Sequence, residues 1–90
     1  MKIAFHPDAE FELNEYALFY ETEIPGLGVR FLDEAQWLSD LIAEHPYLGQ
    51  EIEKDFPHSY IYQIEEARIR VLAVAHHKRI PEYWRERRKR

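Results

Sequence analysis

The stretch Ile69–Trp84 limits the possible folds of this chain more than any other segment. It begins with an apolar run, Ile69–Ala75, that contains β-branched residues and is typical of a buried strand. Basic and aromatic residues follow it directly: His76, His77, Lys78, Arg79, Tyr83 and Trp84. We therefore expect a strand that ends at the edge of the core and presents cations and a phenol to an anionic ligand such as RNA.

Composition restricts the class of protein. The 90 residues predict one domain, residues 1–90, that ends in a basic tail, residues 85–90. The apolar fraction of 46% is too high for a disordered chain. The absence of cysteine excludes disulfides and thiolate metal sites and suits a reducing compartment. No segment resembles a signal peptide or reaches membrane-spanning length, so we expect a cytoplasmic protein with no membrane contact.

The charge is unevenly distributed along the chain. Residues 76–90 carry a net charge of +5, whereas residues 1–75 carry −10. A basic end on an acidic body predicts contact with nucleic acid or with an acidic partner. The alternative is a solvated C-terminal tail, which we favour for Arg87–Arg90.

Two helices are predicted in the first half. Lys2–Phe5 alternates polar and apolar residues, as in a short edge strand. Pro7 then opens a helical apolar pattern that runs to about Glu23. A second helical pattern runs from about Leu27 to Glu44. Because Pro25 and Gly26 break the chain between the two helices, they are expected to pack as an antiparallel hairpin.

The second half predicts a β-hairpin. We expect a loop or a short irregular strand at residues 50–55, then a strand at Tyr60–Glu65. A turn at Glu66 and Ala67 connects it to the apolar strand Arg68–His76, which should be central. The fold class is therefore α+β: an N-terminal strand and an antiparallel helical hairpin packed on a small antiparallel β-sheet.

The candidate catalytic residues are His76, Arg79 and Tyr83. Cleavage of a phosphodiester needs cations that stabilise developing negative charge, and groups that move protons. Arg79 with Lys78 would supply the charge, and Tyr83 or His76 the proton transfer. The structural alternative makes His76 a hydrogen-bonded residue at the edge of the core and uses Tyr83 and Trp84 to close that core. Arg85 and Lys54 are further candidates for substrate binding.

No other catalytic motif is present. The five histidines lack metal-ligand spacing, so no metal or cofactor is expected. Phosphate-binding loops, dinucleotide-binding glycine patterns and nucleophile elbows are also absent.

The chain resembles the RelE/ParE superfamily of toxins from type II toxin–antitoxin systems, specifically the plasmid stabilisation toxins. The resemblance covers nearly the whole chain. It is carried by residues 5–10, Tyr20-Glu21, residues 25–34, residues 42–46, Gly49, residues 56–62, residues 71–76, Arg79, Pro81, Tyr83 and Trp84. It implies the same fold and a cognate antitoxin that neutralises the toxin. The toxin is expected either as a homo-oligomer or in a heterotetramer with the antitoxin.

The resemblance implies one of two targets. RelE-like members cut mRNA on the ribosome as metal-independent endoribonucleases, which would use Arg79 and Tyr83 here. ParE-like members inhibit DNA gyrase and have no established hydrolytic site. The segment before Phe56 is short and acidic, with Lys54 as its only cation, and position 63 is glutamine where relatives often have arginine. These departures weaken the ribonuclease interpretation and leave a catalytically inactive toxin-fold binding module as the alternative.

Overall fold

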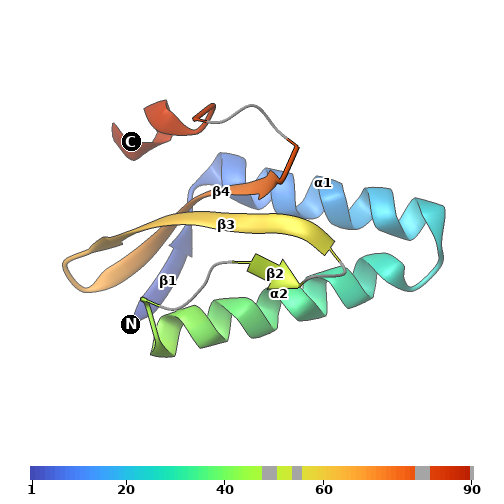
Figure 1. Cartoon of the computed structure of the whole chain (residues 1–90), viewed down its shortest axis with the longest axis horizontal. Coiled ribbons are helices and arrows are strands. Elements are labelled where there is room, and N and C mark those ends of the chain that lie inside the picture. The colour runs from blue at the N-terminus through green and yellow to red at the C-terminus, as the bar shows by residue number, and fades with distance from the viewer. Residues whose placement is uncertain (48–50, 54–55, 79–81, 90) are drawn as a thin grey trace.

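Both helices and the first and last strands lie where the sequence patterns predict them. The computed structural model describes residues 1–47, 51–53, 56–78 and 82–89. In chain order the elements are β1 (Lys2–Phe5), α1 (Pro7–Glu23), α2 (Leu27–Glu44), β2 (Glu51–Glu53), β3 (Phe56–Glu65), β4 (Arg68–His76) and a 3₁₀ helix, η1 (Arg85–Lys89). The α+β class and the helical hairpin are confirmed (Figure 1).

The sheet has the order β1-β4-β3-β2, so the apolar strand β4 is central, as predicted. It is mixed rather than antiparallel throughout, because β1 runs parallel to β4. The reason is visible at the N-terminus, where the Met1 amino group donates to the Ala43 carbonyl over 2.9 Å. Because α2 ends beside the start of β1, the next strand, β2, runs in the same direction as β1. β2 pairs antiparallel with β3, and β3 pairs antiparallel with β4, so β4 also runs in the direction of β1.

For residues 50–55 a loop or a short irregular strand was predicted, and the structure has a strand there, β2, with three residues and an irregular register against β3. The strand β3 begins at Phe56, four residues before the predicted start. A register shift also interrupts the β3–β4 pairing. Ile61 lies opposite Ala73 and Tyr62 opposite Val71, so Leu72 has no partner in the ladder. A bulge of this kind leaves the extra residue outside the regular pairing of the two strands.

The helical hairpin covers one face of the sheet and forms the core with it. Buried residues of this core are Ala9, Ala17, Phe31, Ala35, Leu38, Ile42, Phe56, Tyr60, Ile69, Val71 and Val74. The two helices approach closely at Gly28, where a Cβ atom would collide with the Ala17 carbonyl oxygen. The Glu21 carboxylate accepts from the amides of Gly26 and Gly28 and so satisfies the first turn of α2.

Candidate functional site

The predicted strand end is present at His76. The His76 ring is half-buried, and its Nδ1 accepts from the Lys78 amide over 3.0 Å. His76 faces the helices, because its partner across the sheet is the buried His58. Lys78 is exposed. Two other predicted residues, Lys54 and Arg79, lie outside the described residues.

Tyr83 is shielded rather than presented to solvent. Its phenol oxygen is buried. The guanidinium carbon of Arg87 lies 5.0 Å from the centre of the Tyr83 ring, a cation–π contact. A tyrosine that protonates a leaving group must reach the substrate. In this arrangement the phenol is covered by the protein.

The basic residues after Tyr83 differ in their exposure to solvent. Arg85 is exposed, as expected of a phosphate ligand, but pairs with Glu82 over 3.4 Å. Arg87 was expected in solvent, and that expectation is wrong, because its side chain is only 14% exposed. The physical reason is a buried carboxylate that attracts it: Glu12, on α1.

Glu12 and Arg87 satisfy the backbone around the bulge in β4. The guanidinium donates to both Glu12 oxygens, over 2.9 and 3.1 Å. Glu12 also accepts from the Val74 amide over 3.1 Å, and Arg87 donates to the Leu72 carbonyl over 3.0 Å. The 3₁₀ helix η1 is therefore attached to α1 and β4 through one arginine.

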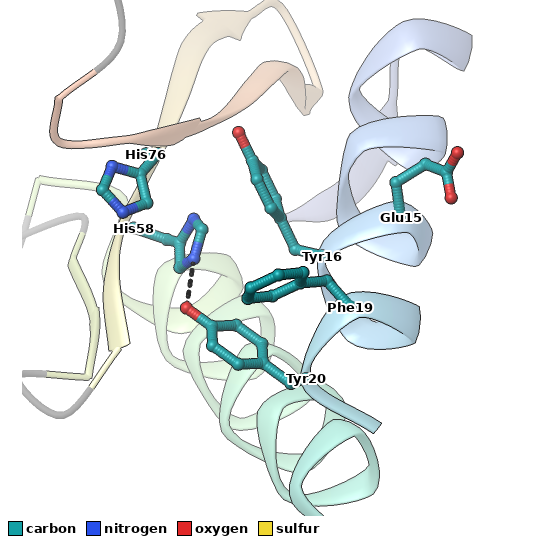
Figure 2. A pocket seen from close by; sticks show the side chains of 6 residues that line it. All are labelled: Glu15, Tyr16, Phe19, Tyr20, His58 and His76. Atoms are coloured by element: carbon teal, nitrogen blue, oxygen red, sulfur yellow. Dashed lines mark hydrogen bonds between the residues drawn. The ribbon is translucent and has the colours of Figure 1, made fainter. Parts of the chain in front are cut away.

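A second cluster, which the sequence analysis did not single out, surrounds His58. The Tyr20 hydroxyl lies 2.8 Å from His58 Nε2. The rings of Tyr16 and His76 lie 4.2 and 5.1 Å from the His58 ring, centre to centre. Figure 2 shows these side chains gathered between α1, the start of β3 and the end of β4. The period of two along β3, which puts His58 on the face of Phe56 and Tyr60, could have located it.

Burial keeps His58 neutral. Desolvation, followed by the charges of His76 and His77, lowers the pKa of His58 to about 4. Burial likewise raises the pKa of Tyr20. At neutral pH His58 is therefore an uncharged ring that shares a hydrogen bond with the Tyr20 hydroxyl. Within the part of the chain that the structure describes, no three His, Asp or Glu side chains gather as metal ligands.

The family comparison agrees with this fold and with the resemblance noted in the sequence. Residues 3–81 match the family model described as the ParE toxin of the type II toxin–antitoxin system, parDE. The chain belongs to the ParE toxin family. ParE toxins pair with a ParD antitoxin. No curated protein matches the chain.

The expectation of a toxin of the plasmid stabilisation type is thus confirmed at the level of the ParE family. For the described residues, no helix combines the length and the apolar character needed to cross a bilayer.

Proposed function

We propose that this ParE-family toxin acts in the cytoplasm by binding and inhibiting DNA gyrase, does not cut mRNA itself, and is neutralised by its cognate antitoxin. The observation that carries this proposal is the position of Tyr83. Its phenol oxygen is buried, and its ring is in contact with Arg87. Arg87 is in turn held by Glu12.

Two further observations support a binding function. The Glu12–Arg87 pair, which holds the guanidinium beside the Tyr83 ring, is partly buried and therefore costly to separate. Arg85, an exposed cation of this segment, pairs with Glu82. A binding inhibitor needs no group that transfers protons, so it can retain such an arrangement without loss of activity.

The experiment is inducible expression in bacteria, with growth, plasmid supercoiling and 5′ ends of mRNA followed together. We expect growth arrest and altered supercoiling without new cuts inside translated codons. Purified protein should inhibit the supercoiling of relaxed plasmid by gyrase. The variants Arg79→Ala and Tyr83→Phe should retain growth arrest, because inhibition by binding requires neither the stabilising charge nor the proton transfer that RNA cleavage would need from them.

The variant Tyr83→Phe is a matched test, since it keeps the ring against Arg87 and removes only the hydroxyl. If cuts within codons appear and vanish in this variant, the protein is a ribonuclease and the gyrase proposal is wrong. If the folded protein causes no arrest at all, the binding-module alternative replaces it. The acidic three-residue strand β2 is the feature that favours that alternative.

A further inference from the structure

A pocket of about 470 Å³ lies beside the His58 cluster. Glu15, Tyr16, Phe19 and Tyr20 of α1 form one side of it, and His58 and His76 form the other. This volume falls in the range of sites that enclose a small ligand or a large side chain. The walls are mainly aromatic, so the occupant should be apolar over most of its surface.

The pocket contains one buried polar atom that needs a partner. His58 is 0% exposed, and its Nδ1 has no hydrogen-bond partner among the described residues. In Figure 2 the ring nitrogen that does not face Tyr20 points toward the space between Tyr16 and His76. A buried polar atom without a partner destabilises the protein, so an occupant that bonds it gains affinity.

A phenol meets both requirements. An aromatic ring can contact Tyr16, Phe19 and His76 edge-to-face or in an offset stack. A hydroxyl both donates and accepts, so it can bond Nδ1 whichever nitrogen of the imidazole carries the proton. Among protein side chains, tyrosine is the one that places a hydroxyl at the far end of a ring.

The surface around the pocket indicates that the tyrosine belongs to a protein. Phe11 and Leu18, seven residues apart on α1, are 64% and 62% exposed, and Phe19 at the rim is 57% exposed. This apolar surface extends beyond what one ring can cover. Glu15 lies at the rim and forms no ion pair with a described residue, on a body with net charge −10 in residues 1–75.

We propose that this pocket binds the tyrosine side chain of a protein partner in which basic residues flank the tyrosine. The ring fills the aromatic pocket, the hydroxyl bonds His58 Nδ1, and an adjacent cation lies near Glu15. Charges of this kind mainly select the partner and speed its encounter. The inference does not depend on whether the toxin acts on gyrase, because it concerns only α1, β3 and β4.

The first test compares p-cresol with toluene, which differ only in the hydroxyl. Binding to the purified protein is measured by NMR titration, with the imidazole nitrogens of His58 observed directly. Because one hydrogen bond is added, p-cresol should bind about three- to tenfold more tightly than toluene. It should also move the Nδ1 resonance. The variant His58→Phe should abolish the difference.

The second test concerns the protein partner. An arginine–tyrosine–arginine tripeptide, blocked at both ends, should bind several-fold more tightly than glutamate–tyrosine–glutamate and than arginine–phenylalanine–arginine. Tyr16→Ala, which removes one wall of the pocket, should weaken all three. Trp37→Ala, on an exposed position of α2, should change none.

Each outcome decides one part of the proposal. Equal binding of p-cresol and toluene overturns the bond to His58. Equal binding of the basic and acidic tyrosine peptides overturns the basic partner. No binding by any probe, or binding that survives in Tyr16→Ala, overturns the pocket itself.

Discussion

Arg87 and Glu12 form a bidentate ion pair between residues that lie 75 positions apart in the chain. The pair joins η1, the last element of the fold, to α1, its first helix. It also caps a bulge in the central strand, because the carboxylate accepts from Val74 and the guanidinium donates to Leu72. The pair therefore links distant parts of the chain and also satisfies backbone groups beside the bulge in the β3–β4 pairing.

Arg87→Ala should lower the free energy of unfolding by about 3 kcal/mol, because it leaves the Glu12 carboxylate buried without its counter-charge. Urea denaturation followed by circular dichroism measures this. Arg85→Ala is the matched control, since Arg85 is exposed and its change should cost less than about 1 kcal/mol. Equal effects of the two variants would contradict the structural role of the pair.

Gly28→Ala should destabilise the protein by about 1–3 kcal/mol, because the new methyl group would collide with the Ala17 carbonyl and with Glu21. The measurement is again the midpoint of urea denaturation. Gly26→Asn is the comparison, since Gly26 has φ +91° and open space around it, and asparagine tolerates left-handed backbone better than other residues. A smaller loss is expected there, and the reverse order would be inconsistent with the close helix contact.

His58 should make the fold less stable in mild acid. Its pKa falls from 6.5 in the unfolded chain to about 4 in the folded one, so between these values only the unfolded state binds the proton. Stability therefore rises with pH across this window, by up to about 3 kcal/mol. Unfolding free energies at several pH values between 4.5 and 7.5 measure the slope.

The variant His58→Phe should flatten that slope, because phenylalanine fills a similar volume and does not titrate. Below about pH 4.5 both proteins should lose stability, since hydrogen bonds lower the pKa of Glu21 and Glu65 in the folded state. If the slope above pH 4.5 is unchanged in His58→Phe, the proton is bound elsewhere.

The double variant Phe11→Ser, Leu18→Ser should leave the unfolding free energy within about 0.5 kcal/mol of the parent, because both side chains are more than 60% exposed. A control double variant in the core, Leu38→Ala with Ile42→Ala, should lose several kcal/mol. Thermal denaturation compares them. A large loss in the surface variant would mean that this face of α1 packs within the protein itself.

Most elements of the fold follow from local sequence. Pro7 starts α1 because its ring suits the first turn of a helix, and Gly26 separates the helices because it adopts a left-handed conformation. The observed bounds of both helices and of β4 coincide with the predicted ones. Each of these signals depends on residues that are close in the chain, so one sequence is sufficient to read them.

The candidate site was predicted less completely. His76 lies at the end of β4, as strand periodicity predicts, and Lys78 follows in the turn after it. Tyr83 was identified as a residue, but nothing in its neighbourhood predicts that Arg87 covers its ring. His58 was passed over, because its importance comes from Tyr16 and Tyr20 on a helix about 40 residues away.

The sequence alone determined the helical hairpin, the central apolar strand and membership of the toxin superfamily, since periodicity, turn residues and motif order are all properties of the chain. Only the tertiary structure decided that β1 runs parallel to β4, that Glu12 meets Arg87, and that His58 is buried beside a pocket. The physical reason is that burial and charge pairing depend on which distant surfaces come together. Local patterns fix the faces of each element but do not specify the partners that those faces will meet.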